Sequence, residues 1–323
     1  MTGETMAGRR DLGTLVEVAK MYYLDGINQS RIAKTLGIST SSVSRMLNQA
    51  RETGLVTVAI NDPREGVGRR EDLEEALAAR FCLESAYVAA HRPGVAPMDL
   101  VARLAAEVVN GRLSQVSSIG LSWGRTVSAF AHCFERPRSM TPLDIYPLSG
   151  GMSVKDSDVS GNASVQALAR RCGGKAHRID APVIVSSAQV CAAMLAEPIV
   201  LEALRDAASC ELAVVGIGSM GVHWSAALSL AAVLSPAEMA EVRAAGIAGD
   251  VCGRTLNDDG EAVRTPVDDH LIGLTLDELR DIPEVIGIAA GAEKSRGVAG
   301  ILRSGIVQSV VVDEQLADVV LST

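Results

Sequence analysis

The segment 120–126 (GLSWGRT) carries the residue types that can hold a phosphate group. It follows an apolar stretch and precedes an amphipathic one, so we expect it to join a strand to a helix. Backbone N–H groups at a helix N-terminus attract anions, and the hydroxyl groups of Ser122 and Thr126 can add hydrogen bonds. A tight turn with an ordinary helix cap is the alternative, and the loop alone does not decide between the two.

Two further loops consist of small residues. Ser149, Gly150 and Gly151 follow the next apolar stretch, where the glycines allow another backbone to approach closely. Residues 216–221 (GIGSMG) match the G-x-G-x-x-G pattern of dinucleotide-binding proteins. That pattern belongs in the first strand-to-helix turn of its domain, whereas here it lies late in the chain and precedes His223 and Trp224. We therefore predict no nicotinamide cofactor, and no other cofactor.

Asp250 and Lys294 are the charged residues most suited to a binding site. Asp250 lies in the glycine-rich segment 246–254, which predicts a turn. Lys294 lies in the first turn of a predicted helix, where its positive charge opposes the helix dipole. A lysine in that place favours an anionic partner, either a carboxylate or a phosphate. A solvated surface lysine is the alternative.

Residues 26–51 indicate a different kind of contact. Apolar residues at helical spacing predict two short helices, with Gly37 at the left-handed end of the first and Ser39 near the start of the second. The second helix turns hydroxyl, amide and guanidinium groups outward, and these contact base edges and phosphates. The predicted DNA-binding residues are Gln29, Ser39, Thr40, Ser41, Ser42, Ser44, Arg45, Asn48 and Gln49. A helical hairpin that touches no nucleic acid is the alternative.

The charge distribution agrees with this prediction. Residues 1–61 have a formal net charge of +2, while the remaining residues have a net charge of −11. A single unit with so few cations would bind DNA weakly, because neutralised phosphates supply much of the affinity. We therefore expect a homo-oligomer, dimer or tetramer, that docks two or more such units on double-stranded DNA.

The composition excludes several other classes of protein. Hydrophobic residues make up 48% of the chain, but no apolar run reaches the length of about 20 residues that spans a membrane. Residues 1–13 lack the apolar core of a signal peptide. The six cysteines include no C-x-x-C pair, so zinc and redox motifs are disfavoured. We predict a cytoplasmic protein with reduced thiols, no metal, no membrane contact and a large core.

The chain is predicted to have two domains, residues 1–61 and residues 62–323. The first has a supporting helix at 12–23 and a short strand at 55–60, and the charged run 64–80 is interpreted as a solvated linker that leads into a helix. Beyond it, apolar strands alternate with amphipathic helices, which predicts an α/β domain with a mostly parallel sheet. The predicted strands are 85–89, 117–121, 143–147, 176–179, 212–216, 285–289 and 308–312. The predicted helices are 100–111, 126–133, 162–172, 198–209, 236–245 and 292–303. Ligands of such sheets bind at the carboxyl ends of the strands.

The ordered motifs resemble the SorC family of bacterial sugar-responsive transcriptional regulators over nearly the whole chain. They are the helix-turn-helix, GLSWGRT at 120–126, PLSGG at 147–151, GIGS at 216–219, AGDVCGR at 248–254, AGAEK at 290–294 and VVVDE at 310–314. The resemblance implies an effector domain related to sugar-phosphate isomerases and CoA transferases. It also implies a phosphorylated sugar or polyol as effector and oligomers that bind operator DNA.

Carried over to this chain, the resemblance assigns the phosphate-binding loop to Ser122, Trp123, Gly124, Arg125 and Thr126. It places Asp250 on the sugar hydroxyls and Lys294 on the phosphate, and it adds Gly150, Gly151, Gln166 and Gly218 to the site. Small or hydroxylated residues also occur in the family at the position of Arg125, so the ligand here can differ at that point.

The leading hypothesis is a DNA-binding regulator, in most such cases a repressor, of carbohydrate or polyol catabolism. The alternative is a sugar-phosphate isomerase-type enzyme with a DNA-binding appendage, in which Asp250 is the general base and Lys294 the electrophile. A third possibility is an α/β domain that only mediates assembly and binds no small ligand.

Overall fold

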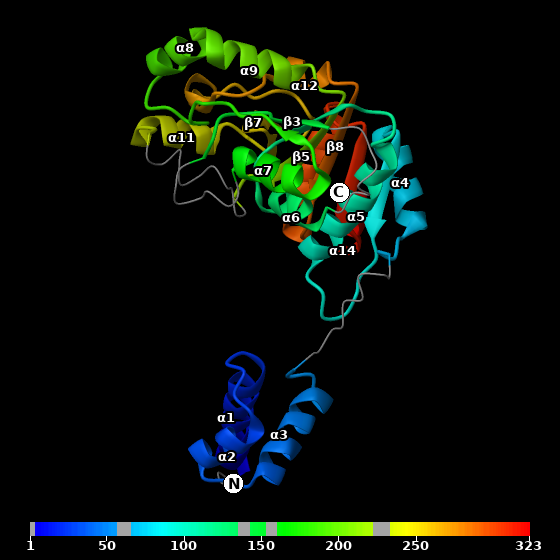
Figure 1. Cartoon of the computed structure of the whole chain (residues 1–323), viewed down its shortest axis with the longest axis vertical. Coiled ribbons are helices and arrows are strands. Elements are labelled where there is room, and N and C mark those ends of the chain that lie inside the picture. Colours follow the sequence, from blue (N-terminus) through cyan, green and yellow to red (C-terminus); the bar gives the residue numbers. More distant parts are fainter. Residues whose placement is uncertain (1–3, 57–65, 135–142, 153–159, 222–232) are drawn as a thin grey trace. The chain divides into compact units, whose positions relative to one another are not determined.

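The computed structural model describes residues 4–56, 66–134, 143–152, 160–221 and 233–323 (Figure 1). The chain forms two compact units, one of residues 1–65 with 92–95 and one of residues 66–91 with 96–323. Within the described residues, no helix combines the length and the apolar character that a membrane crossing requires.

The N-terminal unit contains α1 (Glu4–Tyr23), α2 (Gln29–Leu36) and α3 (Thr40–Glu52). Its core holds Val18, Ile32, Val43 and Leu47, all of which are buried. The turn between α2 and α3 uses the predicted caps. Gly37 ends α2 at a φ of 66°, and the Ser39 side chain accepts a hydrogen bond from the N–H of Ser42. The two predicted helices of the helix-turn-helix are therefore present, and most of the predicted strand at 55–60 lies outside the described residues.

The second unit alternates strands and helices along the chain. Its strands are β1 (Ser85–Ala89), β2 (Ser118–Leu121), β3 (Asp144–Pro147), β4 (Lys175–Ala176), β5 (Leu212–Ser219), β6 (Gly249–Val251), β7 (Arg254–Leu256), β8 (Glu284–Ala289) and β9 (Ser309–Asp313). Its helices are α4 (Glu71–Phe81), α5 (Pro97–Arg112), α6 (Arg125–Cys133), α7 (Gly161–Cys172), α8 (Ala188–Ala196), α9 (Pro198–Ala208), α11 (Pro236–Ala244), α12 (Leu276–Arg280), α13 (Ser295–Arg303) and α14 (Glu314–Ser322), with the 3₁₀ helices η2 (Pro266–His270) and η3 (Ala292–Lys294).

Seven strands form a parallel sheet in the order β1-β9-β8-β5-β2-β3-β4. Parallel strands are covered on both faces, so their residues are apolar in unbroken runs, and every residue of β9 is buried. The far end of β5 leaves the parallel ladder and pairs antiparallel with β6, which pairs in turn with β7. The predicted mostly parallel α/β domain is confirmed.

Several elements differ from the sequence-based expectation. The predicted turn around Asp250 is a strand, β6, and β7 follows it in a tight hairpin. Helix α4 begins at Glu71, inside the charged run that was interpreted as a solvated linker. The reason is that Glu74 is buried there and accepts hydrogen bonds from Arg69 and from the N–H of Val88. The strand predicted at 176–179 is reduced to the two residues of β4.

Three glycines bring α13 against the sheet. A Cβ atom at Gly297 would overlap the carbonyl oxygen of Gly218, and one at Gly249 would overlap the same oxygen and the Gly297 Cα. Only residues without a side chain allow this approach of a helix to two strands. The contact fixes the start of α13, and with it Lys294, beside the end of β5.

Candidate effector site

The candidate site lies where the strand order of the sheet reverses. From β2 the chain continues outward to β3 and β4, whereas from β5 it continues the other way to β8 and β9, and β2 and β5 are neighbours. Loops that leave neighbouring strands in opposite directions open a crevice at their carboxyl ends, which is where ligands of such sheets bind.

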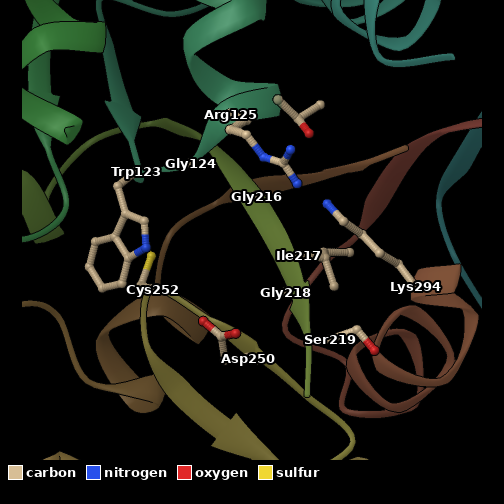
Figure 2. Close-up of a pocket in the computed structure, with 11 residues that line it drawn as sticks. Trp123, Gly124, Arg125, Gly216, Ile217, Gly218, Ser219, Asp250, Cys252 and Lys294 are labelled. Atoms are coloured by element: carbon tan, nitrogen blue, oxygen red, sulfur yellow. The ribbon is translucent and has the colours of Figure 1, made fainter. Parts of the chain in front are cut away.

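A cavity that is open to solvent occupies this position. Figure 2 shows the lining residues, which come from the loop after β2, the start of α6, β5, the β6–β7 hairpin and η3. The lining residues are Trp123, Gly124, Arg125, Thr126, Gly216, Ile217, Gly218, Ser219, Asp250, Cys252 and Lys294.

The loop after β2 presents the N-terminus of α6 to the cavity. Gly124 takes a φ of 122°, a conformation that side chains disfavour, and no side chain caps the first N–H groups of the helix. Ser122 is buried behind the loop, where its hydroxyl accepts a hydrogen bond from the Gly216 N–H at 2.9 Å. Ser122 therefore ties the loop to β5, while the first N–H groups of α6, which no side chain caps, can attract an anion.

Arg125 and Lys294 form the positive side of the cavity. Figure 2 shows their cationic groups pointing toward one another from α6 and η3. Burial lowers the pKa of Lys294 below its ordinary value, and the positive charge of Arg125 lowers it further. Glu293, Asp250 and Asp313 act in the opposite direction but do not outweigh these effects. An anion between the two cations would relieve their repulsion.

Asp250 forms the opposite wall of the cavity, on β6 (Figure 2). Its side chain is buried, and Oδ2 accepts a hydrogen bond from the Gly253 N–H at 3.2 Å. A Cβ atom at position 218 would overlap Oδ1 of this carboxylate, so the glycine makes room for it. A buried carboxylate is an acceptor only, so it suits the hydroxyl groups of a polyol.

The structure brings seven of the predicted effector residues to this cavity and places four elsewhere. Trp123, Gly124, Arg125, Thr126, Gly218, Asp250 and Lys294 line it, whereas Ser122 supports it from behind. Gly150 and Gly151 pack against the backbone of Ala181 and Pro182. Gln166 lines a separate pocket with His132, Ala163 and Arg170.

Sequence reasoning did not single out Cys252 as a lining residue. It lies in the tight turn between β6 and β7 with a φ of 51°, and it lines the cavity together with Trp123 (Figure 2). Burial raises the pKa of its thiol, so the group is an inert lining atom rather than a nucleophile. The motif AGDVCGR at 248–254 contains this residue, but the hairpin that brings it to the cavity was not predicted, so its place in the lining was missed.

The predicted DNA-binding residues gather on and beside α3. Thr40, Arg45, Asn48 and Gln49 are exposed, whereas Ser42, Ser44 and Gln29 are half-buried. The Ser39 hydroxyl lies 2.8 Å from the hydroxyls of both Ser41 and Ser42, so these serines form one cluster at the N-terminus of the helix. Among the described residues, no group of histidine, cysteine and acidic side chains fits a metal ion.

Comparison with known proteins places the chain in a family. Residues 66–322 match the family described as "Putative sugar-binding domain", and the chain belongs to that family. The chain is 30% identical to the transcriptional regulator LsrR of Enterobacter sp. (strain 638), over 95% of this chain and 92% of that protein. It is 28% identical to the sorbitol operon regulator of Klebsiella pneumoniae, over 98% of this chain and all of that protein.

The solved structures agree. The full-length sorbitol operon regulator SorC from Klebsiella pneumoniae superposes with a TM-score of 0.72 at 27% identity, covering 96% of this chain and 99% of that one. A DeoR family transcriptional regulator from Listeria monocytogenes gives a TM-score of 0.69 at 27% identity over 77% of this chain and 98% of that one. The predicted resemblance to SorC-type transcriptional regulators is confirmed.

Proposed function

We propose that this protein is a repressor of carbohydrate or polyol catabolism whose operator binding is controlled by a phosphorylated sugar or polyol. The single observation that carries the proposal is the charge arrangement of the cavity. Two cations and a helix N-terminus without a side-chain cap lie on one side, and one buried carboxylate lies on the other. This arrangement suits a molecule with an anionic end and a hydroxylated end.

The phosphate would bind between Arg125 and Lys294, next to the N–H groups of α6, since helix dipole and side-chain charge then act together. The carbon chain would cross Gly216 and Gly218 on β5, where the absence of side chains leaves room. Its hydroxyl groups would donate to Asp250. Among the described lining residues Asp250 is the sole carboxylate and none is a histidine, while His223 lies outside the described residues. An isomerase would therefore depend on Lys294 as the partner of Asp250.

The N-terminal unit, residues 1–61, would bind operator DNA through α3. Arg45 is the one cation in the middle of that helix, and its exposed guanidinium can reach a base edge or a phosphate. The effector domain, residues 62–323, would bring two or more copies of α3 to the operator. The effector then acts by favouring one arrangement of the copies over another, which requires different affinities for the two arrangements.

Exposed apolar side chains on α8 and α9 support self-association of the effector domain. Residues 181–196 contain no charged residue, yet α8 exposes Val190 at 40% and α9 exposes Ile199 at 65% and Leu201 at 37%. Neighbouring apolar side chains that remain exposed are typical of a subunit interface. We propose that this face of α8 and α9 contacts a second copy of the chain.

A thermal-shift screen against hexose, pentose and polyol phosphates tests the proposed ligand class. A ligand at about 100 times its Kd should stabilise the protein by roughly 2.7 kcal/mol. The gain should vanish in Lys294→Met but remain in Lys175→Met, a variant of a lysine on the distant strand β4. A stabilisation that persists unchanged in Lys294→Met would place the ligand outside this cavity, and the absence of any hit would favour a domain that only mediates assembly.

A further inference from the structure

The motif VVVDE at 310–314 has no part in the cavity lining, although it lies next to it. It forms the end of β9 and the first residue of α14. Asp313 and Glu314 are the polar residues of this motif, and each holds a backbone group from a different segment of the chain.

Asp313 holds the turn that carries Lys294. Its Oδ2 atom accepts a hydrogen bond from the Gly291 N–H at 2.7 Å, and Oδ1 accepts one from the Leu316 N–H at 3.1 Å. Gly291 is the N-cap residue that precedes η3, and Lys294 is the last residue of η3. Asp313 is 4% exposed, so water does not compete strongly for these bonds. Any displacement of the Lys294 turn therefore acts directly on the end of β9.

Glu314 contacts both ends of the segment 66–91, at Arg70 and at His91. One carboxylate oxygen pairs with the guanidinium of Arg70, and the other accepts a hydrogen bond from the His91 N–H at 2.7 Å. The Glu314 side chain is 21% exposed. Asp313 and Glu314 are adjacent in the chain, so one peptide bond joins the group that fixes the Lys294 turn to the group that fixes Arg70.

Arg70 ends the segment 66–70, which runs beside β1. The Arg70 N–H donates to Val88 at 3.0 Å, the Gly68 carbonyl accepts from the Ala90 N–H at 2.8 Å, and the Val67 N–H donates to Glu107 at 3.2 Å. This segment directly follows residues 57–65, which lead in sequence from the helix-turn-helix. Segment 66–70 is therefore the first part of the chain after the helix-turn-helix that is hydrogen-bonded to the effector domain.

We propose that Asp313 and Glu314 are positioning residues that couple the effector cavity to the segment 66–70. A ligand in the cavity restricts the position of the Lys294 turn. Because Asp313 is hydrogen-bonded to that turn, the end of β9 is restricted as well. Glu314, the next residue, then restricts the positions of Arg70 and His91. The proposal rests on the proposed function, since it requires a ligand in the cavity and a DNA-binding unit beyond the segment. A coupling of about 5- to 150-fold between two sites is ordinary for such a device.

The chain offers a matched pair of variants, because Arg70 binds two carboxylates. It donates to Asp72 at 2.9 and 2.8 Å as well as to Glu314. Glu314→Gln and Asp72→Asn each remove one negative charge from the same guanidinium. Only Glu314→Gln weakens a contact that links Arg70 to the residue next to Asp313, and so to the cavity. The remaining carboxylate still holds Arg70 in both variants, so both should fold.

The test is hydrogen exchange of the full-length protein with and without inorganic phosphate, the anion common to the proposed ligands. In the wild type and in Asp72→Asn, phosphate should slow the amides of Gly291, His91 and Arg70 by at least about threefold, because ligand binding suppresses local opening. In Glu314→Gln the effect at Gly291 should remain, while the effects at His91 and Arg70 should disappear.

A response of the 66–70 amides that is equal in Glu314→Gln and in the wild type would overturn the coupling. So would a wild type in which Gly291 responds and the segment does not. A wild type in which neither Gly291 nor Lys294 responds would contradict the proposed ligand class itself. Lys294→Met changes the cavity without a ligand and gives a second readout. The exchange rate of the His91 amide should change in Lys294→Met. It should not change when the same substitution is made in Glu314→Gln.

Discussion

The Lys294 ammonium and the Arg125 guanidinium share one side of the cavity, and burial together with this neighbouring charge lowers the pKa of Lys294. Two cations held in this way are less stable in the empty protein than in one that binds an anion between them. The relationship gives the site both an affinity for phosphate and a dependence on pH.

Affinity for a phosphorylated ligand should fall as the pH rises through the pKa of Lys294 in the free protein. The protonated lysine binds the anion, and the bound anion raises the lysine pKa, so binding is strongest below the free-state value. Calorimetric titrations above about pH 7.5 avoid the ionisation of the phosphate itself, whose second pKa is near 6.

Lys294→Arg is the informative control for this pH dependence, because arginine stays charged over the whole range. The affinity of the Lys294→Arg variant for the phosphorylated ligand should be nearly independent of pH. A wild type whose affinity is flat up to the ordinary lysine pKa would mean that Lys294 does not contact the ligand.

Lys294→Met should stabilise the ligand-free protein. The folded-state pKa of Lys294 lies below its unfolded value, so the folded state binds fewer protons and stability rises with pH between the two values. At neutral pH the half-buried ammonium therefore opposes folding, and its removal should add about 1 kcal/mol to the free energy of unfolding, as is common for residues kept for binding. Denaturant unfolding measures this, and Lys175→Met, at an exposed position, should change little. A loss of stability in Lys294→Met would contradict the pKa argument.

Asp250→Asn should separate recognition of the sugar from recognition of the phosphate. A hydrogen bond to a charged group contributes about 1.5–3 kcal/mol, so affinity for a sugar phosphate should fall roughly 10- to 100-fold. Affinity for inorganic phosphate should stay the same or increase, because a negative charge has been removed from the cavity. Competition binding with both ligands in the same variant measures the two effects, and an equal loss for both would remove Asp250 from the sugar-binding role.

Gly297→Ala should move α13 away from β5 and β6. The added Cβ would overlap the Gly218 carbonyl oxygen and the Ser219 Cα atom, and these backbone atoms cannot move away by a side-chain rotation. We expect a loss of about 1–3 kcal/mol in stability and weaker ligand binding through the displaced Lys294. Gly111→Ala, at a helix position with no atom within 4 Å of the added Cβ, is the matched control and should be neutral or stabilising. Unchanged ligand affinity in Gly297→Ala would show that the glycine contact does not position the site.

The parallel strands could be predicted from the sequence because burial on both faces makes them continuous apolar runs. The bounds of β1 were predicted as observed, and those of β9 within one residue. Helix α8 was missed because its sequence, AQVCAAMLA, has no charged residue and no polar face to reveal a helical period. The β6–β7 hairpin was missed because its strands have only three residues each.

The site was predictable to the extent that local chemistry reveals it. Glycine and hydroxyl residues after a strand indicated the loop around Arg125, and the charge of Lys294 against a helix dipole indicated the second cation. Cys252 and Ile217 reach the cavity only through the hairpin and the extended end of β5, which are tertiary features. Gln166, transferred from the family, lies in another pocket because α7 turns that position outward.

Arg45→Ala should abolish operator binding and leave ligand binding intact, because Arg45 lies on the exposed side of α3 in a separate compact unit. A lost bidentate contact to a base pair costs about 1–3 kcal/mol in discrimination. Fluorescence anisotropy with labelled DNA and a thermal shift with the sugar phosphate measure the two activities in one preparation. If both activities survive the substitution, α3 does not contact the bases through this residue.

The most direct test is the affinity of the full-length protein for its operator, measured by anisotropy with and without the phosphorylated ligand found by thermal shift. The operator is first selected from a random double-stranded library. We expect the ligand to change the operator Kd by at least about fivefold in the wild type and to have no effect in Lys294→Met. An operator Kd that does not depend on the ligand, or that responds equally in Lys294→Met, would contradict the proposed control of DNA binding by this cavity.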